Sequence, residues 1–278
     1  MKKTIFIIGA ITLLLATSCK KNDNNSTTTP PRDVTEVWNE NKVAIENFLK
    51  THTYTFTPTT TISETVTFAT TSNTTESIFA NSNLKQMELD VYDANNKRVR
   101  HTLYYMILQE GTGTTTTIAD SVYVNYKGQL LDLSVFDKSS TQTTGYWFDL
   151  IGNITNSRQA GVIKGFREGI ALLKSSSSNQ LIPNNDGTYT IPTDGGIGVF
   201  FIPSGLGYFN NVQSKIPAYS PLIFTVNLIS TKRADHDHDG KPSINEIERD
   251  QYGIISYPDC DAKKDNTYLP DYLDADCK

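Results

Sequence analysis

Aromatic and branched aliphatic residues recur in short segments between Asp120 and Ser230, and these segments could converge on one apolar hole. We expect them to fold as strands, a bulge and a helix, so that residues far apart in sequence line the same space. A dry hole of this kind binds an apolar group and orients it through a few polar atoms. The segments are VYVNYKG (122–128), FD (136–137), VIKGFREG (162–169), IPSGLGY (202–208), IP (216–217) and LIFTV (222–226).

The order and spacing of these segments resemble the FKBP-type peptidyl-prolyl cis-trans isomerases. Packing alone rarely produces Tyr-x-Gly, Phe-Asp, Val-Ile-x-Gly-Phe-x-Glu-Gly and Ile-Pro-Ser…Tyr together in this order. The resemblance implies an isomerase that binds proline-containing polypeptides and needs no cofactor for catalysis. It also implies ten pocket residues: Tyr126, Phe136, Asp137, Tyr146, Val162, Ile163, Phe166, Tyr208, Ile216 and Phe224.

The resemblance gives each pocket residue a role. Three groups would face the polar atoms of a bound peptide: the Asp137 carboxylate, the backbone N–H of Ile163 and the Tyr208 hydroxyl. The remaining residues would form the walls, and Phe166 would form the floor. Rotation about an X-Pro bond must cross a barrier of about 18–20 kcal/mol that amide resonance sets. A dry aromatic cavity favours the twisted, less polar amide over the planar ground state.

The sequence departs from the family pattern at several points. Phe166 stands where Trp is frequent, Gln142 where Arg often pairs with the Asp, and Phe209 where Gly is usual. An insertion over about 175–194 contains Asn-Asn-Asp-Gly, which is typical of a turn, and it predicts an extra hairpin.

Alternating carboxylates near the C-terminus indicate a cation site. Residues 235–246 read DHDHDGKPSINE and fit the calcium-loop pattern D-x-D-x-D-G-x5-E. The loop resembles those of dockerin and thrombospondin type 3 repeats, and it predicts structural Ca²⁺. The predicted ligands are Asp235, Asp237, Asp239, Glu246 and the backbone carbonyl of Lys241. An alternative for the same residues is a capping box that Ser243 and Glu246 would form. We expect His236 and His238 to face solvent.

The N-terminus resembles a bacterial lipoprotein signal. Lys2 and Lys3 precede an apolar run over 5–16, which is too short to span a bilayer comfortably, and small residues then lead to Cys19. Cys19 would carry lipid, so the mature protein would be exported and held on a bacterial membrane. The remaining cysteines, Cys260 and Cys277, form an even pair that can make a disulfide in an exported compartment.

Charge is distributed unevenly along the chain. The segment from Asp235 to Lys278 holds 12 acidic and 5 basic side chains, a net charge of −7, whereas the whole 278-residue chain carries −5. This balance gives no electrostatic case for binding nucleic acid.

Periodicity predicts an α+β fold, an antiparallel sheet wrapped around one short helix. Helical spacing predicts a helix over 34–50, and alternation predicts Thr-rich strands over 51–77. We expect further strands over 102–109, 120–131, 135–137, 147–150, 198–202 and 222–229, and a helix from 159 or 160 to 173. The segment 84–100 shows no clear helix or strand periodicity.

These features divide the chain into five predicted parts: a signal peptide (1–18), a disordered tether (19–32), a helix and strand extension (33–100), an FKBP-type domain (101–232) and a calcium-binding tail (233–278). The predicted function is X-Pro isomerisation that assists the folding of exported proteins. Two alternatives are a non-catalytic module that grips peptides, and a structural surface lipoprotein.

Overall fold

The computed structural model describes residues 30–58, 65–139, 145–261 and 268–277. The signal peptide, Cys19, Gln142 and most of the predicted tether lie outside these residues. Chain contacts separate residues 1–31 from a compact unit formed by residues 32–278. Among the described residues, no helix combines the length and the hydropathy that crossing a membrane requires.

The first helix, α1 (Val34–Thr51), begins at the predicted residue and extends one residue beyond the predicted end. The Asp33 side chain caps it by accepting a hydrogen bond from the backbone N–H of Glu36 at 2.8 Å. Apolar positions at helical spacing then give the helix one buried face, which includes Ile45, Phe48 and Leu49.

The other elements follow in chain order. The strands are β1 (His52–Phe56), β2 (Val66–Thr70), β3 (Leu84–Tyr92), β4 (Arg98–Gln109), β5 (Ser121–Leu130), β6 (Val135–Lys138), β7 (Tyr146–Asp149), β8 (Ile182–Pro183), β9 (Tyr189–Thr190), β10 (Gly196–Ile202), β11 (Leu222–Lys232), β12 (Glu248–Arg249) and β13 (Ile255–Ser256). The helix α3 (Lys164–Ile170) and the 3-10 turns η1 (Ile78–Ala80), η2 (Ser157–Gln159), η3 (Ser204–Leu206), η4 (Ser243–Asn245) and η5 (Asp271–Leu273) complete the set.

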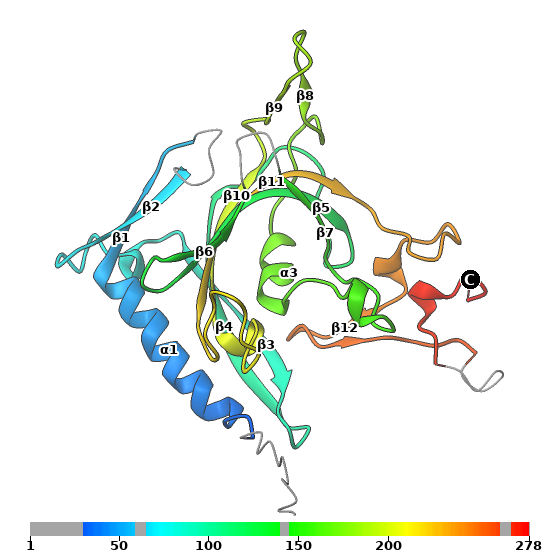
Figure 1. Cartoon of the computed structure of the whole chain (residues 1–278), viewed down its shortest axis with the longest axis horizontal. Helices are drawn as coiled ribbons and strands as arrows, with labels where there is room; N and C mark the ends of the chain where they lie inside the picture. Colours follow the sequence, from blue (N-terminus) through cyan, green and yellow to red (C-terminus); the bar gives the residue numbers. More distant parts are fainter. Residues whose placement is uncertain (1–29, 59–64, 140–144, 262–267, 278) are drawn as a thin grey trace, which may run out of the picture. The chain divides into compact units, whose positions relative to one another are not determined.

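Within the described residues, the main sheet has seven strands in the order β3-β4-β10-β11-β5-β6, and β7 also pairs with β5. All of these pairings are antiparallel. The sheet curves around α3, and α1 lies against its other side (Figure 1). This is the predicted FKBP-like arrangement of an antiparallel sheet with few helices.

Strand alternation divides the apolar side chains between two faces of the sheet. On the inner face, Leu103, Phe200 and Phe224 pack with residues of α3. On the outer face, Met106 and Phe201 pack with residues of α1, β1 and β2, among others. The N-terminal helix and the Thr-rich strands therefore cover the back of the sheet that carries the pocket.

The segment 84–100, which gives no clear signal in the sequence, forms β3, a turn and the start of β4. Met87, Leu89 and Val91 alternate and pack on the inner face, but Glu88 and Asp90 between them disfavour a strand by propensity. Arg100, the predicted end of the extension, lies inside β4, so the main sheet includes strands from both sides of that boundary.

The predicted helix over 159–173 is too long. The α-helical part is Lys164–Ile170, and Ile163 before it is extended, with ψ of 146°. Gly161 accounts for the late start: its Cα packs directly on the backbone of Leu150 and Ile151, an approach that a side chain would block. The segment before α3 is therefore held as an extended chain.

The predicted insertion contains the two-stranded hairpin β8–β9, whose turn is closed by a hydrogen bond from the N–H of Gly187 to the carbonyl of Asn184. The hairpin projects away from the main sheet (Figure 1).

The segment 233–277 packs on the rest of the unit. The Arg249 guanidinium donates to the buried Glu168 carboxylate of α3 at 2.5 Å, and Arg98 pairs with Asp250 at 2.6 Å. The N–H of Asp90 in β3 donates to the carbonyl of Tyr252 at 2.8 Å. We call this segment the C-terminal module.

Candidate active site

The inner face of the sheet leaves a cavity of about 1070 Å³ beside α3. Nine of the ten pocket residues that the sequence predicts line it: Tyr126, Phe136, Asp137, Val162, Ile163, Phe166, Tyr208, Ile216 and Phe224. They come from β5, β6, the start of α3, the segment 208–216 and β11, so the fold brings together residues that are almost 100 positions apart.

Tyr146 is the exception among the ten residues, although its ring packs edge-on against the cavity residue Tyr126 at a centroid distance of 6.0 Å. Tyr146 is 44% exposed and is not among the described residues that line the cavity. Phe148 lines it instead, two residues further along the same face of β7. Phe148 packs edge-on against Tyr126 and Phe166, with ring centroids 5.7 Å apart in both pairs. The alternation of β7 was the signal that could have added Phe148 to the candidates.

Aromatic rings form the floor and inner walls of the cavity. Phe166, which is 4% exposed, meets Phe224 edge-on at a centroid distance of 5.0 Å and Tyr126 at 6.3 Å. Each ring therefore packs against its neighbours, and the floor of the cavity is apolar. Gly165, the residue before Phe166, lets α3 approach closely, because its Cα packs on the Ile202 side chain of β10.

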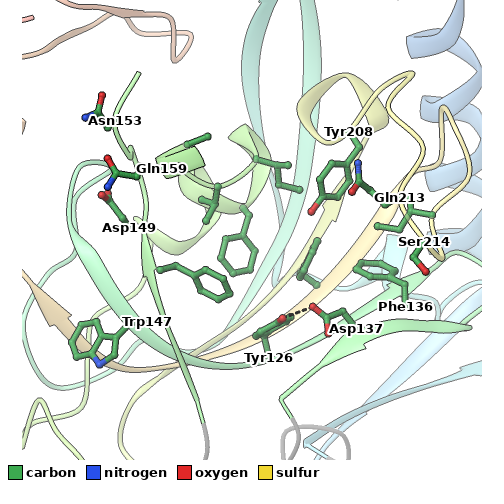
Figure 2. Close-up of a pocket in the computed structure, with 18 of the residues that line it drawn as sticks. Tyr126, Phe136, Asp137, Trp147, Asp149, Asn153, Gln159, Tyr208, Gln213 and Ser214 are labelled. Carbon is green, nitrogen blue, oxygen red and sulfur yellow. Dashed lines mark hydrogen bonds between the residues drawn. The ribbon is translucent and has the colours of Figure 1, made fainter. Parts of the chain in front are cut away.

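A short hydrogen bond ties two of the polar groups together. The Tyr126 hydroxyl donates to the Asp137 carboxylate at 2.5 Å (Figure 2). Burial, together with the Asp137 carboxylate, raises the pKa of Tyr126 above its usual value, so the hydroxyl keeps its proton at neutral pH. This hydrogen bond fixes the position of the Asp137 carboxylate.

Tyr208 enters the cavity from the loop after η3. Burial raises the pKa of its hydroxyl, and the nearby charge of Asp137 adds to the effect, so this group also remains a donor. The next residue, Phe209, has a left-handed φ of +48° at the position where Gly is usual in the family. Its ring packs edge-on against Tyr219 at 5.1 Å, a contact that supports the unusual backbone.

Ile163 is the last extended residue before α3, and it lines the cavity next to Val162. This placement keeps its backbone N–H outside the intrahelical hydrogen bonding of α3, which is consistent with the predicted donor role.

One end of the cavity contains residues that the sequence did not predict. Trp147, Asp149, Asn153 and Gln159 lie at the end away from Tyr208 (Figure 2). The C-terminal module adds His236 and Leu273 to the lining. No pattern in the sequence links these two residues to the cavity, because their distance from it depends on how the module packs.

The acidic loop of the C-terminal module is a second candidate site. Carboxylate oxygens of Asp235, Asp237 and Asp239 lie within 4.8 Å of one another, and Gly240 makes the turn with φ of +95°. The Lys241 N–H donates to Asp239 at 2.7 Å. Glu246 is 2% exposed, and within the described part of the chain neither of its carboxylate oxygens has a hydrogen-bond partner.

Like charges crowd this loop. Burial and the carboxylates of Asp237 and Asp239 raise the pKa of Glu246 to about 7. The Lys241 ammonium lies 3.9 Å from a Glu246 carboxylate oxygen. Asp235, Asp237 and Glu246 each have at least one buried oxygen without a hydrogen-bond partner in the described part of the chain. Together with Asp239, these carboxylates fit a hard cation such as Ca²⁺, which takes six to eight oxygen ligands.

Ser243 does not form the alternative capping box. Pro242 is the N-cap residue of η4, and no side chain caps this turn. The Ser243 hydroxyl instead contacts His236, accepting from its backbone N–H at 3.1 Å and lying 2.8 Å from its Nδ1. The expectation that His236 faces solvent is therefore wrong, since its side chain is only 13% exposed, whereas His238 is exposed.

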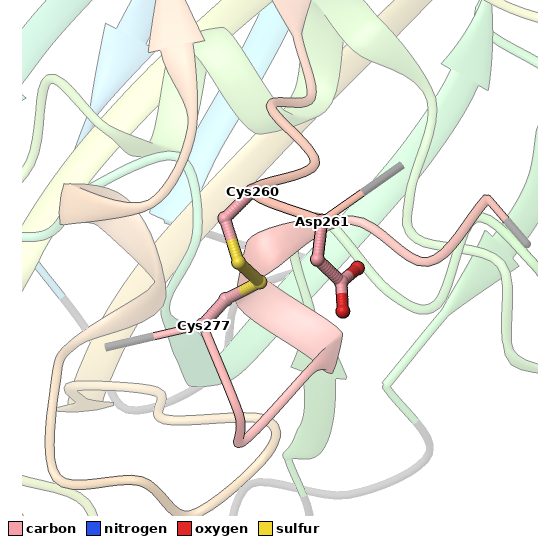
Figure 3. A group of neighbouring side chains, drawn as sticks. All are labelled: Cys260, Asp261 and Cys277. Carbon is pink, nitrogen blue, oxygen red and sulfur yellow. A yellow bond between two sulfur atoms is a disulfide. The ribbon is translucent and has the colours of Figure 1, made fainter. Parts of the chain in front are cut away.

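Cys260 and Cys277 are joined in a disulfide, with Asp261 beside them (Figure 3). The disulfide removes both sulfur atoms as thiolate ligands, so this group crosslinks the end of the module and is a poor metal site.

Comparisons with known proteins agree with this geometry. The family described as "FKBP-type peptidyl-prolyl cis-trans isomerase" matches residues 113–229. The FKBP-type isomerase FkpA of Escherichia coli K12 is 31% identical over 143 residues, which are 51% of this chain and 42% of that protein. The isomerase Mip of Coxiella burnetii is 30% identical over 138 residues, 49% of this chain and 48% of that protein.

The chain thus spans less than half the length of these two relatives. The crystal structure of FkpA from Escherichia coli is similar over 55% of this chain and 53% of that chain, with 27% identity and a TM-score of 0.37. The matched segment contains nearly every residue of the aromatic cavity. Residues 113–229 are thus similar to the FKBP-type peptidyl-prolyl cis-trans isomerases.

Proposed function

We propose that this protein catalyses cis-trans isomerisation of X-Pro bonds and so assists the folding of exported proteins. The observation that carries the proposal is the aromatic cavity, in which Phe166, Phe224, Phe148 and Tyr126 form an apolar floor and polar groups line the ends. It binds a proline ring and leaves the flanking peptide at the polar rim.

The cavity favours the transition state over the ground state of the reaction. A planar amide is strongly polar because of resonance, and rotation about the C–N bond removes that resonance. Transfer from water to a dry aromatic site therefore costs the planar amide more than the twisted amide. No covalent step and no proton transfer is needed.

Three polar groups hold the twisted peptide. The Asp137 carboxylate, fixed by Tyr126, faces the carbonyl that rotates out of plane. The Ile163 N–H and the Tyr208 hydroxyl donate to peptide carbonyls on either side. These contacts orient the substrate, and the aromatic walls supply the environment.

The test is an X-Pro isomerisation assay on the chain from residue 20 onward, by NMR exchange spectroscopy. We expect acceleration over the uncatalysed rate, and we expect Tyr208→Phe and Phe166→Leu each to lower kcat/KM by about 3- to 10-fold, equivalent to about 1 kcal/mol. Tyr54→Phe and Phe68→Leu, which make the same changes on the outer face of the sheet, are the matched controls.

Peptide binding without acceleration, from a folded protein, would point to a non-catalytic peptide-binding module. Absence of both binding and acceleration would leave a structural surface lipoprotein as the better interpretation.

We also propose that the protein is exported and lipid-anchored through Cys19. The support is the N-terminal sequence: a basic start, a short apolar run and small residues before Cys19. Metabolic labelling with a fatty acid in a bacterial host should label the protein, and Cys19→Ser should abolish the label and release the protein from membranes.

We further propose that the acidic loop holds Ca²⁺ through Asp235, Asp237, Asp239, Glu246 and the carbonyl of Lys241. The buried Glu246 supports this, because neither of its oxygens has a hydrogen-bond partner among the described residues, and burying a carboxylate without hydrogen bonds is costly. Isothermal titration with Ca²⁺ should show one binding event, which Glu246→Gln abolishes. Equal Ca²⁺ binding by Glu246→Gln would contradict the proposed ligand set.

A further inference from the structure

The C-terminal module forms part of the cavity that we propose as the isomerase site. His236 and Leu273 line the cavity together with Asp149, Asn153 and Gln159. A peptide long enough to extend beyond the proline therefore meets residues that do not belong to the FKBP-type domain. The position of these residues depends on how the module is held.

His236 connects the acidic loop directly to the cavity. It lies between Asp235 and Asp237, and its Nε2 is 2.9 Å from a carboxylate oxygen of Asp149. A carboxylate only accepts hydrogen bonds, so Nε2 donates. On the other side of the ring, Nδ1 contacts Ser243, three residues before Glu246. The ring thus connects both arms of the acidic loop, residues 235–239 and residues 243–246, to this end of the cavity.

Asp149 connects His236 to the loop after β7 through hydrogen bonds. Its other carboxylate oxygen accepts hydrogen bonds from the backbone N–H groups of Ile151 at 3.2 Å and Gly152 at 2.9 Å. Burial on its own would raise the pKa of Asp149, but the bonds from His236 and Gly152 lower it, so the charged form is the one held here.

Tyr272 makes a second connection to the same loop. Its ring is fully buried, and its hydroxyl donates to the Gly152 carbonyl at 3.0 Å and accepts from the Ile154 N–H at 3.1 Å. The His236 ring packs edge-on against Tyr272 at a centroid distance of 5.5 Å. His236, Tyr272 and Asp149 therefore fix the loop that carries Asn153 and leads to Gln159.

The two arms of the acidic loop repel each other when no cation neutralises them. The carboxylates of Asp235, Asp237 and Asp239 come from one arm, and the buried Glu246 comes from the other. A divalent cation draws the two arms together. His236 belongs to the first arm, and its ring contacts Ser243 of the second.

We propose that Ca²⁺ in the acidic loop sets the position of His236 and, through Asp149, the shape of one end of the client cavity, so that cation binding and client binding are coupled. The proposal rests on the isomerase function and the calcium site proposed above. Coupling between two sites is reciprocal, so each ligand must raise the affinity for the other by the same factor.

The experiment measures both affinities on the chain from residue 20 onward, by calorimetry with a proline-containing peptide of about eight residues. We expect the peptide to bind about fivefold or more tightly in saturating Ca²⁺ than in EDTA. We expect saturating peptide to raise the Ca²⁺ affinity by the same factor.

His236→Asn is the decisive variant, because the shorter side chain does not reach Asp149. It should bind Ca²⁺ as the unaltered protein does when peptide is absent, and it should lose the Ca²⁺ dependence of peptide affinity. His238→Asn is the matched control: it makes the same substitution in the same loop, at an exposed residue with φ of +65°, where Asn is well tolerated. It should retain the coupling.

Different failures identify different causes. If Ca²⁺ binds but peptide affinity is equal in Ca²⁺ and in EDTA, the proposed coupling is wrong and both sites remain. If His236→Asn retains the full Ca²⁺ dependence of peptide affinity, the coupling through His236 is wrong and both sites again remain. Peptide binding without any Ca²⁺ binding removes the calcium site and the coupling but not the isomerase. Absence of peptide binding at every Ca²⁺ concentration removes the client cavity and the coupling together. Circular dichroism in EDTA checks that the protein remains folded in each case.

Discussion

The two faces of the main sheet carry similar apolar residues but are covered to different extents. On the outer face, the 18-residue α1 and the β1–β2 hairpin pack over Met106, Phe201 and their neighbours. On the inner face, α3 has only seven residues, which span about 10 Å. The space beyond its ends is the aromatic cavity. The length of the covering helix therefore decides whether an apolar sheet face becomes core or a binding site.

The largest expected effect tests this difference directly. Phe48→Ala removes a 3% exposed ring from α1 that packs against Phe68 and Phe201. We expect it to lower the free energy of unfolding by about 3–5 kcal/mol and to leave kcat/KM unchanged, because the outer face does not contact the cavity. Urea unfolding and the isomerisation assay measure the two quantities.

Phe79→Ala is the control for this variant, since Phe79 belongs to the same region but is 44% exposed. Its effect on stability should be below about 1 kcal/mol. A loss of activity in Phe48→Ala at a temperature where it remains folded would show that the two faces are not independent.

A smaller effect concerns His101, where elements of the two faces meet. Its ring is 1% exposed and lies between Trp38 of α1, at 5.0 Å, and Gly205 of η3. Burial lowers the pKa of His101 to about 4. The folded protein thus holds the neutral ring, and the unfolded chain takes up the proton more readily. The contribution of the buried neutral His101 to the free energy of unfolding is complete above pH 6.5, and it is lost as the pH falls from 6.5 towards 4.

Between pH 7 and pH 5 this contribution should fall by about 2 kcal/mol. Urea unfolding across that range measures it, and His101→Gln should show a correspondingly flatter pH dependence. An unchanged slope in the variant would mean that other groups cause the acid sensitivity.

The smallest effect concerns the start of α1. Asp33→Ala removes the side chain that accepts from the Glu36 N–H and should cost about 1 kcal/mol in the free energy of unfolding. Asp33→Asn keeps an acceptor at the same place and should cost much less. Equal losses in the two variants would assign the effect to the charge of Asp33 and not to the cap.

Local patterns in the sequence predicted much of the fold. Asp33 and the spacing of Ile45, Phe48 and Leu49 located α1 to within one residue, because capping and helical period act over short distances. The family resemblance placed nine side chains that the structure brings to the cavity. These residues lie on regular strands or beside α3, where a position along the chain determines a position in space.

The failures have a different origin. The start of α3 depends on the contact of Gly161 with Ile151, which no local pattern reports. Tyr146 and Phe148 lie on the same face of β7, so strand alternation does not tell which of the two rings lines the cavity. The contact between His236 and Asp149 joins residues 87 positions apart and depends on how the C-terminal module docks.

The order of strands in the main sheet has a consequence for how the chain acquires its structure. Strand β10 lies between β4 and β11, and Ile107 of β4 pairs with Gly198 of β10. Strand β11 in turn joins β10 to β5. Until residues up to Lys232 are available, β4 and β5 have no central partners, so the sheet closes late and through non-local contacts that slow folding. A protein that we propose as a folding catalyst therefore completes its own pocket only when most of its chain has been delivered.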